Sequence, residues 1–203
     1  MRRAIFFAIL LCGVPPNLFA QRYYDSELPR YELGLRLDLV NIHAAGAMVG
    51  GGATFHYNFN GHLALDSQFA FGPVTISGGN AGGHTTFLTG IRTGQRVEDS
   101  GFFIHARGGF LHYVNANGTS LLSRTSFPAF NVGGTFEQYF GPIRRSGGTN
   151  MVFRLEFGAL IVPYGSATII PSSSPTIGSS PAPTGPLRTR VGPVLGLGIG
   201  FRF

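Results

Sequence analysis

Strict alternation of apolar and polar residues is the feature that most constrains how this 203-residue chain can fold. From Tyr31 to Phe203, apolar residues recur at every second position in eight separate segments. A spacing of two places successive side chains on opposite faces of a β-strand, whereas a helical face needs a spacing of three to four. The pattern predicts eight strands, at about 31–40, 48–59, 62–72, 86–94, 102–114, 130–140, 152–162 and 188–203.

Charged residues fall on the polar face of these predicted strands. In the first segment, leucines occupy one face, while Glu32, Arg36 and Asp38 occupy the other. Six arginines and five carboxylates follow this rule, so their charges nearly balance and we predict a network of ion pairs among them. The set comprises Glu32, Arg36, Asp38, Asp66, Arg92, Arg107, Glu137, Arg154, Glu156, Arg190 and Arg202.

The length and composition of the segments favour a membrane barrel over a secreted β-sandwich, although both show this alternation. Most segments reach the roughly ten residues that cross a bilayer at a tilt. Glycine is frequent on the polar face, as a cramped interior requires. An arginine facing lipid at mid-membrane would cost about 2–4 kcal/mol, which favours an inward orientation. The predicted fold class is therefore all-β, an eight-stranded antiparallel up-and-down transmembrane β-barrel.

The first twenty residues have the layout of a secretory signal peptide. Arg2 and Arg3 precede an apolar run over 4–11, and the small residue Ala20 precedes a polar stretch. The apolar run is too short to span a bilayer as a helix. We expect residues 1–20 to be a cleavable signal, 21–30 a short periplasmic lead-in and 31–203 the barrel domain. Cys12 would leave with the signal, so no disulfide or cysteine metal site is expected.

The final strand, VLGLGIGFRF, alternates apolar residues with glycine and ends on an aromatic residue. Together with the signal and the eight strands, it resembles the small outer-membrane β-barrels of Gram-negative bacteria, such as the transmembrane domain of outer-membrane protein A. The resemblance implies an outer-membrane location among outer-membrane lipids, and a terminal strand that the β-barrel assembly machinery recognises. The residues that match this assembly signal are Leu195, Leu197, Ile199, Phe201 and Phe203. It also implies aromatic girdles, for which the tyrosines available are Tyr31, Tyr57, Tyr139 and Tyr164.

The same resemblance sets the expected topology. With a periplasmic N-terminus, the turns at 60–61, 96–101 and 141–150 face the periplasm. The loops at 43–47, 73–84, 115–128 and 163–187 are external, and the last three are candidates for binding an extracellular ligand.

Other functional classes find little support in the sequence. The arginines are dispersed, apart from Arg144 and Arg145, so no basic stripe suggests nucleic acid. His56 and His105 point inward on separate strands and are read as part of a polar core, so no metal site, cofactor or catalytic residue is predicted. Lipid A deacylases carry an H-x-S motif that this chain lacks.

We therefore expect a monomeric, non-enzymatic outer-membrane barrel that acts through structure and through its external loops. A narrow porin-like channel is the alternative. A lipid A-modifying enzyme and a secreted β-sandwich rank below it.

Overall fold

The computed structural model describes residues 29–42, 46–76, 79–97, 99–115, 124–140, 150–167 and 188–203. The predicted signal peptide and most of the predicted lead-in lie outside the described residues. Within these ranges, the structure contains no helix long and apolar enough to cross a membrane. The eight strands are β1 (Tyr31–Ile42), β2 (Gly46–Asn58), β3 (Leu63–Ile76), β4 (Gly79–Val97), β5 (Ser100–Asn115), β6 (Ser126–Phe140), β7 (Asn150–Pro163) and β8 (Thr189–Arg202).

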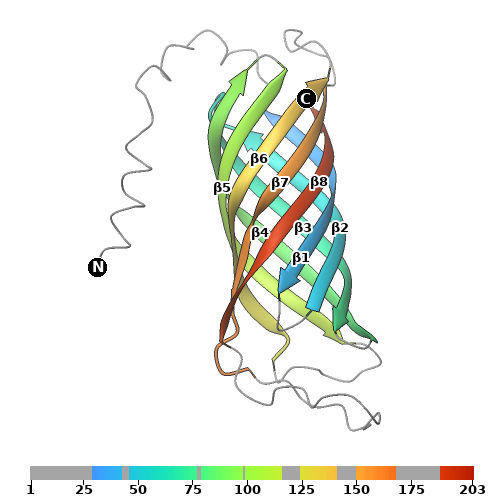
Figure 1. The fold of residues 1–203 in the computed structure, drawn as a ribbon. Helices are drawn as coiled ribbons and strands as arrows, with labels where there is room; N and C mark the ends of the chain where they lie inside the picture. The colour runs from blue at the N-terminus through green and yellow to red at the C-terminus, as the bar shows by residue number, and fades with distance from the viewer. Residues whose placement is uncertain are drawn as a thin grey trace, which may run out of the picture.

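The strands form one closed barrel in sequence order (Figure 1). Each strand pairs antiparallel with its neighbours in the sequence, and β8 pairs with β1 to complete the circle. This confirms the predicted all-β, eight-stranded up-and-down fold. We call the end that holds Tyr31 and Phe203 the terminal end, and the opposite end, where β1 runs into β2, the loop end.

The first and last residues of the barrel close its seam at the terminal end. The amide of Tyr31 donates to the carbonyl of Phe203 at 3.1 Å, and the amide of Phe203 donates back to Tyr31 at 3.0 Å. Their rings also stack, with centroids 6.2 Å apart. Phe203 therefore extends the backbone pairing of the seam by one residue beyond β8, and no edge is left unpaired at this point.

The two faces of the sheet have reversed polarity compared with a soluble protein. Large apolar side chains point outward along every strand, and Leu35 is 74% exposed. Ten charged side chains point inward and are buried. Tyr139 and Tyr164, which we expected in the outer girdles, are instead buried inside the barrel, whereas Tyr31 is exposed and Tyr57 is partly exposed.

The strands are longer than the sequence pattern indicated, and three expected connections shrink accordingly. The external loop predicted at 73–84 is wrong, because β3 continues to Ile76 and β4 begins at Gly79. A register shift between Pro73 and Thr75 accommodates the proline, which cannot donate a ladder hydrogen bond. Likewise, β5 and β6 extend into the predicted 115–128 loop, and the predicted turn at 96–101 narrows to the residues between Val97 and Ser100. Of the other connections, 43–45, 141–149 and 168–187 lie outside the described residues.

Close approach between strands explains some of the inward glycines. A Cβ on Gly52 would overlap the carbonyl oxygen of Phe69 on the neighbouring strand. A Cβ on the adjacent, outward-facing Gly51 would meet Leu37 Cδ2 at 3.8 Å and the Arg36 carbonyl oxygen at 4.0 Å, both ordinary contacts. Adjacent glycines on one strand therefore have opposite tolerance for a side chain.

We predict that Gly52→Ala destabilises the folded barrel by about 1–3 kcal/mol, the usual cost of overpacking. Gly51→Ala, one residue away, is the matched control and should change stability by less than about 0.5 kcal/mol. Urea unfolding in lipid vesicles, followed by gel migration of the folded band, measures both. Equal effects of the two substitutions would contradict the close-approach explanation.

Candidate functional site in the barrel interior

Strand alternation gathers most of the predicted charged residues inside the barrel, toward the terminal end. Each side chain comes from an inward position of its strand, and each residue is no more than 6% exposed. The inward set comprises Glu32, Arg36 and Asp38 from β1, Asp66 from β3, Arg92 from β4, Arg107 from β5, Glu137 from β6, Arg154 and Glu156 from β7, and Arg202 from β8. We call these ten residues, with His56 from β2, the lumen network.

Glu32 and Glu137 are the carboxylates of the lumen network that lie nearest the terminal end. Glu32 pairs with Arg154 and accepts from Arg202 Nε at 3.2 Å. Glu137 pairs with Arg92 and accepts from Arg154 Nε at 2.7 Å. Arg154 thus bridges both carboxylates. The hydroxyl of Tyr139 donates to the second oxygen of Glu137 at 2.6 Å, which explains why this tyrosine turns inward.

His56 joins this cluster to the centre of the lumen. Its Nδ1 lies 3.2 Å from Glu32 and its Nε2 lies 3.0 Å from Asp66. Asp66 in turn pairs with Arg107 at 2.6 Å. Strands β1, β2, β3 and β5 are therefore connected across the interior by one chain of carboxylates, the His56 imidazole and the Arg107 guanidinium.

Arg107 and Glu156 form the central pair. Arg107 Nη1 donates to Glu156 Oε1 at 2.6 Å, and Nη2 donates to Oε2 at 3.0 Å. Two parallel bonds of this kind are the strongest geometry available to an arginine and a carboxylate. Glu156 also accepts from Arg36 at 3.4 Å, and Arg36 pairs with Asp38 and hydrogen-bonds Gln68. All five carboxylates and five of the predicted arginines belong to one continuous network.

Arg190 is the predicted member that the structure leaves out. It occupies an inward position of β8, but it lies at the loop end and is exposed. No described carboxylate forms an ion pair with it, because the described carboxylates of the barrel interior lie deeper, toward the terminal end.

Arg96 is the interior arginine that our sequence reasoning missed, because residues 96–101 were assigned to a turn. Its Nη2 donates to Asn58 at 2.8 Å and its Nε to Tyr139 at 3.2 Å. The guanidinium also lies 5.1 Å from the ring centroid of Phe103. Arg96 is four residues from Arg92, and an even spacing places both on the inward face of one strand. This spacing could have indicated that Arg96 faces the interior.

A layer of apolar side chains fills the lumen toward the loop end, where we expected polar residues. We call it the apolar layer. Within it, the Tyr113 and Tyr164 hydroxyls lie 2.5 Å apart, and the Phe127 ring packs against Tyr164 with centroids 4.7 Å apart. Its described members are Met48, Val74, Leu88, Leu111, Tyr113, Phe127, Ala129, Leu160, Val162, Tyr164, Ala167 and Val194.

The outer surface carries one pairing of potential chemical interest. His112 Nδ1 and Ser126 Oγ lie 2.7 Å apart, on neighbouring strands near the loop end. The pair does not form an H-x-S motif, because its residues are 14 positions apart in the sequence and meet only through the pairing of β5 with β6. No described carboxylate contacts His112, and the described residues contain no group of three histidine, cysteine or acidic side chains placed to hold a metal.

The residues of the predicted assembly signal form one outward row on β8. Leu195, Leu197 and Ile199 lie on the β1–β8 seam opposite Leu39, Leu37 and Leu35. All five residues of the row, from Leu195 to Phe203, are exposed.

Loss of one partner from the central pair should be costly. Replacement of a buried carboxylate leaves the opposing charge without compensation, at about 3–5 kcal/mol. We therefore predict that Glu156→Gln lowers the unfolding free energy by about 3 kcal/mol. Ser67→Ala, an outward position with a single hydrogen bond to Thr89 at 2.8 Å, serves as the control and should lose less than about 1 kcal/mol. Urea unfolding in vesicles measures the two variants, and a Glu156→Gln barrel as stable as the parent would refute the network's role.

Comparisons with known proteins were made for both sequence and structure. No family model and no curated protein matches the chain. Among solved structures, the chain is similar to the N-terminal β-barrel domain of Pseudomonas aeruginosa OprF, with 14% identity and a TM-score of 0.42. The match covers 85% of this chain and 97% of that domain.

Proposed function

We propose that this chain is an integral outer-membrane β-barrel protein without enzymatic activity, whose interior is closed and whose external loops mediate surface interactions. The single observation that carries the proposal is the reversed polarity of the sheet. Leucine and phenylalanine side chains cover the outside, while ten charged groups are buried within. A sheet with this polarity is stable only where the surrounding medium is apolar.

The dimensions of the barrel support a membrane location. The strands are 12 to 19 residues long, whereas about 9–11 tilted residues cross the hydrocarbon core. Pairing of β1 with β8 closes the seam from Glu32 and Arg202 to Val40 and Val194. A membrane-spanning sheet requires such closure because lipid offers no hydrogen-bonding partner.

The filled interior supports a structural role over a channel. Toward the terminal end, ion pairs connect strands across the lumen. Toward the loop end, the side chains of the apolar layer occupy the lumen instead. Eight-stranded barrels are just wide enough for their own side chains to fill them. A narrow channel, the alternative, would require both layers to rearrange together.

The distribution of carboxylates supports a non-enzymatic role. The chain has nine, of which five belong to the lumen network. The other four are Asp25 and Glu27, which precede β1 in the sequence, and Glu98 and Asp99, which fall between β4 and β5 in the sequence. The His112–Ser126 pair near the loop end therefore has no acidic residue in the nearby sequence to orient the histidine, as a Ser–His–Asp triad does.

The remaining features of the proposal concern partners. We propose that the outward row from Leu195 to Phe203 is recognised by the β-barrel assembly machinery, that the barrel is a monomer among outer-membrane lipids, and that the segments 115–128 and 163–187 bind extracellular ligands. Only two residues separate β3 from β4, so this connection is much shorter than the loop we expected there.

Deletion of Phe203 tests this proposal in cells. Loss of the residue removes two backbone hydrogen bonds to Tyr31 and the aromatic end of the outward row. We expect a several-fold lower yield of folded protein in the outer-membrane fraction, read from its heat-modifiable gel migration. Phe140→Ala removes another exposed phenylalanine at the terminal end and should leave the yield near that of the parent. Recovery of the parent protein in the soluble fraction would refute the membrane location, and normal assembly of the deletion variant would refute the role of the final strand.

A further inference from the structure

The seam between β1 and β8 opens toward the loop end. Pairing between these strands runs from Glu32 and Arg202 to Val40 and Val194, and it stops there. Beyond that point, β1 continues to Ile42 paired only with β2, and β8 continues from Pro193 to Thr189 paired only with β7. Pro193 has no amide hydrogen to donate, so it is a natural end for the ladder.

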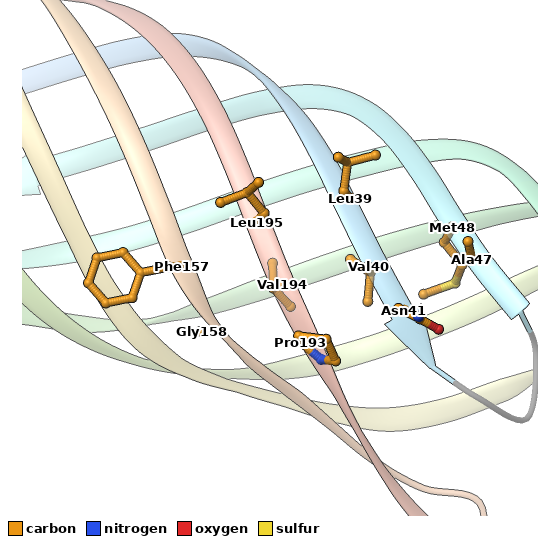
Figure 2. Close-up of a pocket in the computed structure, with 10 residues that line it drawn as sticks. All are labelled: Leu39, Val40, Asn41, Ala47, Met48, Phe157, Gly158, Pro193, Val194 and Leu195. Carbon is orange, nitrogen blue, oxygen red and sulfur yellow. The ribbon is translucent and has the colours of Figure 1, made fainter.

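A groove of about 570 Å³ occupies this opening. Figure 2 shows Leu39, Val40 and Asn41 of β1 on one side, and Pro193, Val194 and Leu195 of β8 on the other. Ala47 and Met48 of β2 and Phe157 and Gly158 of β7 complete the lining, in which Asn41 is the one polar side chain. The volume lies within the roughly 300–1,000 Å³ of ordinary small-molecule pockets.

The groove reaches from the outer surface to the apolar layer. Leu39, Leu195 and Phe157 belong to the exposed outer face, whereas Met48 and Val194 are buried members of the apolar layer, and Val40 packs against that layer. The groove therefore offers hydrocarbon contacts on two levels, which a flat lipid-facing sheet does not.

The loop end beside this groove is cationic. Arg124, Arg188 and Arg190 are exposed there, and no described carboxylate pairs with them. All nine carboxylates of the chain fall elsewhere in the sequence, as set out above. Arg190 is three residues from Pro193 along β8, a distance of about 10 Å. Its position belongs to the inward face of β8, but the side chain is exposed, so a positive charge lies on the loop-end side of the apolar groove.

We propose that this groove binds one anionic lipid of the surrounding membrane, with a hydrocarbon chain between β1 and β8 and its anionic headgroup at Arg190. The inference rests on the proposed membrane location. A second copy of the barrel is a poorer occupant of the groove. Two barrels inserted in the same orientation would bring their loop-end arginines, Arg124, Arg188 and Arg190, close together without carboxylates to compensate them.

Retention of lipid by the folded protein tests the site. The folded chain is transferred to detergent micelles that contain equal amounts of phosphatidylglycerol and phosphatidylcholine with identical acyl chains, and bound lipid is counted by native mass spectrometry. We expect one retained phosphatidylglycerol per barrel, with preference over phosphatidylcholine. Arg190→Gln should lower that preference about fivefold, the effect of one arginine near an anionic surface. Ala47→Leu, which fills the groove, should abolish retention.

Two matched controls separate the site from general effects. Arg124→Gln removes another exposed arginine of the loop end, and Ala106→Leu enlarges an exposed alanine of β5 away from the groove. Both should retain the lipid as the parent does. Equal retention of the two lipids by the parent, or equal losses in the control and groove variants, would overturn the proposal.

A fluorescence measurement covers the case in which a variant fails to fold. The chain has no tryptophan, so Leu39→Trp at the groove and Phe110→Trp on the exposed face of β5 are each the sole reporter. The vesicles contain phosphatidylcholine and a low fraction of brominated phosphatidylglycerol, which quenches tryptophan fluorescence on contact. From the quenching, we expect the apparent occupancy by the brominated lipid to be about fivefold higher at Leu39→Trp than at Phe110→Trp. Equal quenching at both positions would overturn the proposal while leaving the membrane location intact, whereas failure of the parent to enter vesicles would refute the location itself.

Discussion

Charges buried in a narrow lumen need compensation by opposite charges and hydrogen bonds in good geometry, and the interior of this barrel depends on that condition. Removal of an ion from water costs several kcal/mol even after relaxation, and pairing with additional hydrogen bonds must offset that cost. Five arginines and five carboxylates meet the condition through one network that includes His56. Because the partners come from different strands, the network also fixes the strands relative to one another across the lumen.

The rest of the structure is arranged around that constraint. Alternation along each strand keeps charges inside and leucine or phenylalanine outside, so the outer surface suits an apolar medium. Closure of the seam by Tyr31 and Phe203 removes the last unpaired edge at the terminal end. Toward the loop end, where the described interior holds no carboxylate, apolar side chains fill the lumen instead. The arginines at that end, Arg124, Arg188 and Arg190, are exposed instead of paired within the lumen.

Much of this arrangement was predictable from the sequence, because a period of two determines which face each residue takes. The fold class and the inward position of residues such as Glu32 and Arg107 follow from that rule. The apolar layer did not, since Leu88 and Leu111 are isolated departures from a polar face and Phe127 falls in the loop predicted at 115–128. They form a layer only once the register brings them together. The lengths of β3 and β4 were underestimated because glycine and proline between 72 and 83 indicate a loop, although backbone pairing continues through them. The separation of Arg190 from the network depends on depth within the barrel, which alternation does not encode.

The central claim is that paired charges and the apolar layer together close the lumen. Ion conductance of the parent protein in planar bilayers tests it most directly, with the folded state of the inserted sample verified by heat-modifiable migration. The account predicts no conductance steps above the bare bilayer. Reproducible steps that scale with salt concentration would show a continuous aqueous path and contradict it.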